Sequence, residues 1–172
     1  MAGGYVEYLG FLVFLVGALL LARLLRGTSE ISGWLAACIG GTAVTYTAAT
    51  IATGFAAGAA ALYDGHHGAP LATITTVNDV RNFAFFLSIG VLGVFTLAVA
   101  GAVHATRTLP TWLAYTGYVV GLVSIAAVPA ARVGGTDSAN LLWLVWFLAL
   151  GVAALRGPRS VAAAVEAVSI GA

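Results

Sequence analysis

The chain of 172 residues contains no lysine, a single cysteine and few charged side chains of either sign. Charged residues make up 8% of the sequence and hydrophobic residues 61%, whereas globular proteins carry about 25% charged residues. With seven arginines and a formal net charge of +1, the chain has no basic patch for a nucleic-acid partner. These shortages exclude a soluble domain and indicate an integral membrane protein, with the lipid bilayer as its main partner.

Recognisable catalytic motifs are also missing. The lone Cys38 excludes an intramolecular disulfide and lies in an apolar segment, where we expect it to pack as a small side chain. There is no GxSxG, HExxH, CxxC, phosphate-loop or dinucleotide motif. The sequence therefore predicts no catalytic residue, no metal ligand and no cofactor, which weighs against an enzyme.

Long apolar runs dominate what is present, and they predict an all-α protein, a polytopic transmembrane helical bundle that forms one domain over residues 1–172. A helix of about 21 residues reaches about 31 Å, enough to cross the hydrocarbon core. Pro110 suits the first position of a helix, and Pro129 is expected to end or kink one. Five membrane-spanning helices are predicted at about 5–25, 33–62, 80–105, 111–130 and 139–155, followed by a short cytoplasmic tail at 157–172.

The arginines divide unevenly between the two ends of such a bundle. Cytoplasmic loops of membrane proteins carry the excess of Lys and Arg. We therefore expect an inner-membrane, multi-pass protein with its N-terminus outside and its C-terminus in the cytoplasm. Five arginines are expected on the cytoplasmic side, namely Arg23, Arg26, Arg107, Arg156 and Arg159, and two outside, namely Arg81 and Arg132.

One polar segment, residues 63–82, interrupts the apolar chain and is expected to face outward. We expect it to bind a small hydrophobic ligand, a membrane-protein partner or a second copy of the chain. His66 and His67 are adjacent, so their rings diverge, and the pattern favours a solvated turn over a metal site. The predicted binding residues are Asp64, His66, His67, Asn78, Asp79, Arg81 and Asn82.

Within that segment, Thr76 and Asp79 match a helix start signal, with Asp79 in the first turn where the helix dipole favours an anion. Arg81 would then oppose the dipole. We expect its guanidinium to need a carboxylate, a lipid phosphate or a path to the membrane surface. The carboxylates predicted on the same side are Asp64, Asp137 and Glu7.

The second predicted span carries four hydroxyls at spacings of four, four and three residues, which places them on one helix face. In one interpretation each threonine hydroxyl donates to the carbonyl four residues earlier, and the stripe is structural. In the other interpretation it lines a polar cavity or path. The four residues are Thr42, Tyr46, Thr50 and Thr53.

Small residues four positions apart recur in three helices, a spacing that lets helix backbones approach closely in lipid. Such contacts form within one chain or between the subunits of a homo-oligomer. The pairs are Gly54 with Gly58, Ala36 with Gly40, and Gly117 with Gly121.

The stretch Asn78-Asp79-Val80-Arg81-Asn82, followed by Thr108-Leu109-Pro110-Thr111-Trp112-Leu113 and Gly117, resembles the uncharacterised small multi-pass membrane proteins of high-GC bacteria. The shared signature is L-P-x-W-L, and the similarity covers most of the chain. The resemblance implies a body of six helices with no assigned function. This chain is expected to carry five of them and to lack the usual first helix.

Three classes of function are left open by these patterns. The favoured one is a non-catalytic membrane protein that binds a ligand or partner through residues 63–82, as an accessory subunit of a larger complex. The alternative is a small transporter or channel that uses the threonine-lined face of the second helix. An intramembrane enzyme is the third.

Overall fold

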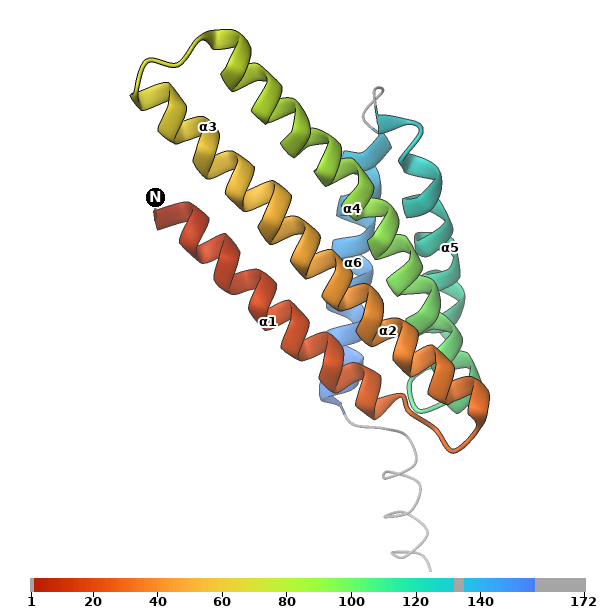
Figure 1. Ribbon diagram of the computed structural model, residues 1–172. Coiled ribbons are helices and arrows are strands. Elements are labelled where there is room, and N and C mark those ends of the chain that lie inside the picture. The colour runs from red at the N-terminus through yellow and green to blue at the C-terminus, as the bar shows by residue number, and fades with distance from the viewer. Residues whose placement is uncertain (1, 132–134, 157–172) are drawn as a thin grey trace, which may run out of the picture.

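The computed structural model describes residues 2–131 and 135–156 and shows an all-α helical bundle (Figure 1). The described part contains no strand, which confirms the predicted fold class. The predicted tail at 157–172 and Arg132 lie outside the described residues. The elements are α1 (Ala2–Leu24), α2 (Glu30–Ala49), the π-helix η1 (Thr50–Phe55), α3 (Ala56–His66), α4 (Leu71–Thr106), α5 (Thr111–Ala127) and α6 (Gly135–Leu155).

Helices α2, η1 and α3 form one continuous rod, Glu30–His66, of 37 residues. Ser29 begins it as the N-cap, where its side chain accepts a hydrogen bond from the Ser32 backbone N–H at 3.2 Å. Within η1 the bonding shifts by one residue, so that the Ala56 N–H donates to the carbonyl of Ile51. A π-helical turn carries an extra residue and changes the direction in which later side chains point.

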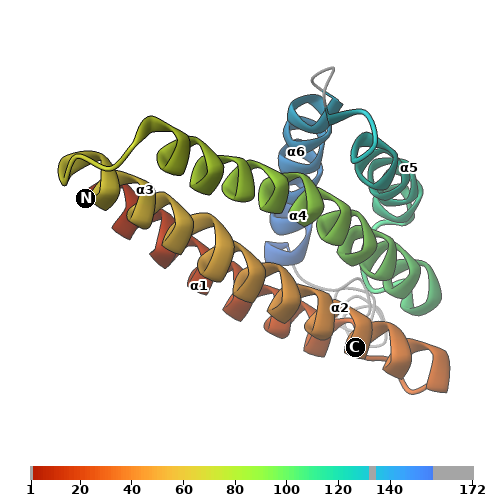
Figure 2. The ribbon, with the colours of Figure 1, turned by 45° about the horizontal axis from the view of Figure 1, so that its top comes forward.

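Helix α4 lies at the centre, with α2 and α3 on one side and α5 on the other (Figure 2). Its buried residues all fall between Ser88 and Val103. A Cβ added at Gly93 would lie 2.8 Å from the Gly121 carbonyl oxygen, and one added at Gly121 would lie 2.9 Å from that of Gly93. The backbones of α4 and α5 therefore touch, and the predicted Gly117/Gly121 contact is confirmed as packing within the chain.

An aromatic cluster joins α1, α2, α4 and α6. The ring of Phe14 in α1 lies at the middle of it, and the Trp143 and Phe147 rings of α6 stack at 4.8 Å. Trp143 Nε1 also donates a buried hydrogen bond to Thr96 Oγ1 at 3.0 Å. The rings that contact Phe14, with centroids 5.3 to 6.1 Å away, belong to Tyr46, Phe95, Trp143 and Phe147.

The N-terminal half of α4 extends beyond this packed body. A Cβ added at Gly90 would lie 3.1 Å from Cγ2 of Val128, the residue that follows α5. Before Gly90, α4 runs beside α3 as an antiparallel helical hairpin that projects past α5 (Figures 1 and 2). Helix α3 has no buried residue, so the hairpin is the least covered part of the described structure.

Three helices are long and apolar enough to cross a membrane: Glu30–His66, Leu71–Thr106 and Gly135–Leu155. Two shorter apolar stretches, Tyr8–Leu24 and Thr111–Ala127, accompany them. The chain is thus a helical membrane protein. Several boundaries differ from those predicted by three or four residues, among them the end of the second helix at His66 and the start of α6 at Gly135. The largest difference is at α4, which begins at Leu71, nine residues before position 80.

Candidate functional site

The predicted binding segment, residues 63–82, forms the tip and one arm of the α3–α4 hairpin. The two helices are joined by a short turn in which Gly68 has a φ of +76° and Pro70 precedes the first residue of α4. The carbonyl of Asp64 accepts backbone hydrogen bonds from His67 at 3.2 Å and Ala69 at 3.0 Å. The segment is therefore two helix ends closed by a tight turn, and not a long loop.

The two histidines separate, as predicted from their adjacency. The ring of His67 stacks on Tyr63 with centroids 3.9 Å apart, and its Nδ1 lies 2.8 Å from the Tyr63 carbonyl oxygen. His66 is exposed. Among the described residues no group of three His, Cys, Asp or Glu side chains could hold a metal ion. His67 thus helps to close the end of α3, whereas His66 is open to a partner.

The remaining predicted residues lie within α4 and not at its start. Thr76 donates its hydroxyl to the Ala72 carbonyl at 2.9 Å, and the N-cap of α4 is Pro70. The predicted start signal at Thr76 and Asp79 is therefore wrong. Because the helix dipole acts only within the terminal turns, it neither explains Asp79 nor opposes Arg81. Asn78, Asp79, Arg81 and Asn82 are all exposed.

Arg81 lies across the surface of α3. A Cβ added at Gly58 would lie 3.6 Å from Arg81 Nε, 3.7 Å from its Cδ and 4.0 Å from its Cζ. Gly58 therefore faces an arginine side chain and not a helix backbone, whereas a Cβ added at Gly54 would meet only Thr50 of its own segment, at 3.5 Å. No carboxylate among the described side chains lies within 4.0 Å of Arg81. The predicted pairing with Asp64 or Asp137 is wrong, and the side chain of Glu7 lies outside the described part.

The three threonine hydroxyls of the stripe on the second helix are satisfied by their own backbone. Thr42, Thr50 and Thr53 donate to the carbonyls of Cys38, Tyr46 and Ala49 at 2.7, 2.8 and 2.5 Å. The Tyr46 ring packs against Phe11 and Phe14 of α1. These contacts agree with the structural interpretation of the stripe, and they do not bring it together with Arg81.

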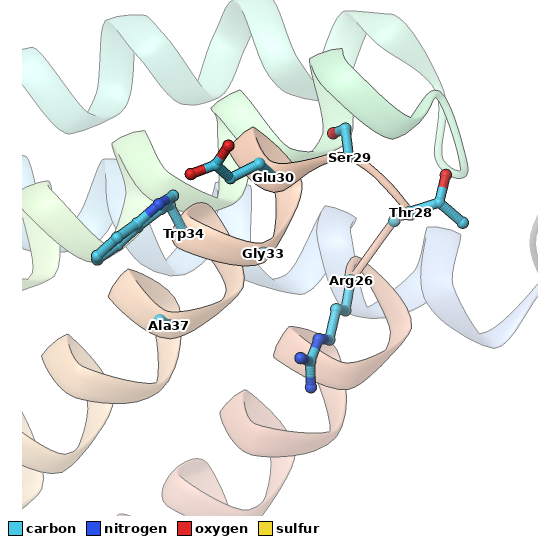
Figure 3. Close-up of a pocket in the computed structure, with 8 residues that line it drawn as sticks. Arg26, Thr28, Ser29, Glu30, Gly33, Trp34 and Ala37 are labelled. Carbon is cyan, nitrogen blue, oxygen red and sulfur yellow. The ribbon is translucent and has the colours of Figure 1, made fainter.

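An open hollow of about 550 Å³ lies at the other end of the bundle, in the turn between α1 and α2 (Figure 3). Figure 3 shows the Arg26 and Glu30 side chains pointing apart, so the two charged groups do not converge in the hollow. Sequence reasoning missed it, although Ser29 followed by Glu30 is a typical helix start. Its lining residues are Arg26, Gly27, Thr28, Ser29, Glu30, Gly33, Trp34 and Ala37.

The same end of the bundle carries the described arginines other than Arg81. They stand at the end of α1, after α4 and after α6, where these elements meet at one end in Figure 1. Trp34 and Trp112 are 68% and 52% exposed close to that end. Exposed tryptophans beside arginines are typical of a membrane–water interface. The four arginines are Arg23, Arg26, Arg107 and Arg156.

Comparison of the chain with models of known families, with curated proteins and with solved structures found no match. The resemblance to small multi-pass proteins of high-GC bacteria stays a prediction.

Proposed function

We propose that the chain is a non-catalytic inner-membrane protein whose α3–α4 hairpin binds a membrane-protein partner, as an accessory subunit of a larger complex. The observation that carries this proposal is the exposed apolar surface of a hairpin that also bears the polar residues of segment 63–82. Leu62, Leu71 and Phe83 are 65%, 78% and 67% exposed. Exposed apolar groups next to polar ones are typical of interaction sites.

The length of α4 supports the proposal. Its 36 residues extend about 54 Å, while the hydrocarbon core of a membrane is about 30 Å thick. Membrane helices tilt by up to about 40°, at which α4 still rises about 41 Å. One end of α4 therefore leaves the hydrocarbon, and the hairpin is the end at which α4 has no buried residue. Leu71 at its tip is then in water unless a partner covers it.

The orientation follows from the arginines. In the proposed arrangement all five helical rods cross the membrane, with Arg23, Arg26, Arg107 and Arg156 in the cytoplasm. The N-terminus and the hairpin then face outward, and the C-terminus faces the cytoplasm. A partner of the hairpin is therefore a protein with a surface at the outer face of the inner membrane, or a second copy of this chain.

Site-specific photocrosslinking in cells tests the proposal. A photoreactive amino acid replacing Leu71, at the hairpin tip, should give a discrete adduct of higher mass. The matched control is Leu148 on α6, which is 68% exposed and should react only with lipid. An adduct at twice the mass of the chain would identify a second copy as the partner. If Leu71 gives no protein adduct, or if Leu148 gives the same one, the hairpin is not the docking surface.

A small transporter or channel is the second candidate, and one observation favours it. The hydroxyls of Thr47 and Ser124 are buried without a hydrogen-bond partner in the described part of the chain. Buried polar groups in membrane helices are often completed by water or by a transported solute. Solute flux into proteoliposomes that depends on Thr47 and Ser124 would support this candidate over the first.

A further inference from the structure

The side chain of Arg81 lies beside Gly58 and has no ionic partner among the described residues. Its Nε, Cδ and Cζ lie 3.6 to 4.0 Å from the position where Gly58 would carry a Cβ. An added Cβ at position 58 would make ordinary contact with the Arg81 side chain, and only a larger side chain would occupy the surface that Arg81 now covers. Gly58 therefore forms a notch in α3, and Arg81 lies over it with its charge exposed.

The depth of Arg81 in the membrane follows from its position along α4. Arg107 ends this helix at the tryptophan-rich end of the bundle, and 26 residues separate it from Arg81, a rise of about 39 Å. With an average tilt of about 20°, the two arginines are about 37 Å apart along the membrane normal. That distance lies between the hydrocarbon thickness of about 30 Å and the full thickness of about 40 to 45 Å. When Arg107 is at the cytoplasmic headgroups, Arg81 is at the outer ones.

The neighbours of Arg81 on its helix face match the parts of a phospholipid. Asn78 precedes it by three residues and Phe85 follows it by four, so the three side chains share one face of α4. Asn78 lies toward the hairpin tip, and Phe85, which is 41% exposed, lies toward the bundle. A polar group, a cation and an apolar ring thus follow one another from the headgroup level to the acyl-chain level.

We propose that Arg81, over the Gly58 notch, binds the phosphate of an anionic phospholipid in the outer leaflet, with an acyl chain lying along Phe85. The planar guanidinium presents two parallel N–H donors to a phosphate. No described carboxylate competes for these donors within 4.0 Å. This inference rests on the proposed function for the outward placement of the hairpin, and it names the lipid that binds at the base of the partner site.

Native mass spectrometry of the full chain in detergent, with limiting phosphatidylglycerol added, tests the lipid site. The wild type should retain one lipid more than Arg81→Gln, whose affinity at this site should fall at least about tenfold because a charged hydrogen bond is lost. Gly58→Leu keeps the charge but fills the notch, and it should lose the same lipid. Ala59→Leu, at the exposed neighbouring position, is the matched control and should retain it.

Several outcomes would overturn the proposal. Two concern the variants: equal lipid retention by Arg81→Gln and the wild type, or equal lipid loss in Ala59→Leu and Gly58→Leu. Two concern the lipid: its displacement by millimolar inorganic phosphate, or equal retention of a glycolipid that has no phosphate. If Arg81→Gln does not fold, the Gly58→Leu and Ala59→Leu pair decides. The Leu71 crosslink separates the two proposals: loss of the partner adduct with lipid retention intact contradicts the docking function alone, and the reverse contradicts the lipid site alone.

Discussion

Glycine has two opposite uses in this fold at the scale of single residues. In the packed body, Gly93, Gly117 and Gly121 let α4, α5 and α6 approach each other, and a Cβ added at any of them would lie within 2.9 Å of a neighbouring atom. In the hairpin, Gly58 accommodates a flexible arginine, and its added Cβ would meet only ordinary contacts. Substitution should therefore have very different costs at positions that share the same sequence spacing.

Gly121→Ala should lower the stability of the protein in detergent by about 1 to 3 kcal/mol, because overpacking a filled contact forces a shift of backbone or side chains. The new Cβ would lie 2.7 Å from Leu97 Cγ and 2.9 Å from the Gly93 carbonyl oxygen. The measurement is the free energy of unfolding or the melting temperature. Gly151→Ala is the control, because nothing lies within 4 Å of its added Cβ. Equal effects at positions 121 and 151 would show that α4 and α5 are not in backbone contact.

Spacing alone could not distinguish these glycines. The four-residue repeat predicts which helix faces carry side chains small enough for another helix to pack closely. This prediction is confirmed for Gly117 and Gly121. What approaches each face depends on the neighbouring helix, and Gly58 faces Arg81 because the antiparallel α4 places that residue there. The predicted pairing of Arg81 with Asp64 or Asp137 relied on a helix start near position 80, which the structure places nine residues earlier, at Leu71.

At the scale of elements, α4 shows why hydropathy misplaces helix ends. The stretch before position 80 is polar, so it was predicted to lie outside the helix. Its backbone is nevertheless helical, with the Thr75 and Thr76 hydroxyls donating to the carbonyls of Leu71 and Ala72. Hydropathy reports where a chain prefers water over lipid, whereas helix ends are set by caps and turns such as Pro70 and Gly68. The two boundaries coincide only when a helix stops at the membrane surface.

The hydroxyls of η1 give a prediction at the same scale. Thr50 and Thr53 donate to carbonyls four residues earlier, so Thr50→Val and Thr53→Val should each change the free energy of unfolding by less than about 0.5 kcal/mol. Valine keeps the shape, and hydroxyls that bond back to their own helix add little to its stability. Thermal melting in detergent measures this. Destabilisation well above that value, or a loss of solute flux in proteoliposomes, would mean that these hydroxyls serve a polar path.

At the scale of the whole molecule, the fold class and the approximate positions of the helices could be predicted, because long apolar segments leave a chain few alternatives to membrane helices. The site could be predicted only as a segment. Residues 63–82 form the tip and one arm of the hairpin, and two of their contacts could not be predicted: His67 stacks on Tyr63, and Arg81 lies over Gly58. The contact of Arg81 with Gly58 depends on the pairing of α3 with α4, which no periodicity within either helix reveals.

The orientation of the molecule in the membrane can be tested directly by cysteine labelling. In a Cys38→Ser background, a membrane-impermeant maleimide should label a His66→Cys variant in intact spheroplasts, because the hairpin faces outward when the four described arginines at the other end stay in the cytoplasm. A Thr28→Cys variant, in the turn between α1 and α2, should react only after permeabilisation. Both positions are exposed, so a difference in labelling reports sidedness and not burial. The Cys38→Ser chain alone is the unlabelled control.

Reversed labelling would invert the topology and place Arg81 at the cytoplasmic leaflet. Labelling of both positions in intact spheroplasts would mean that the rod Glu30–His66 between them does not cross the membrane.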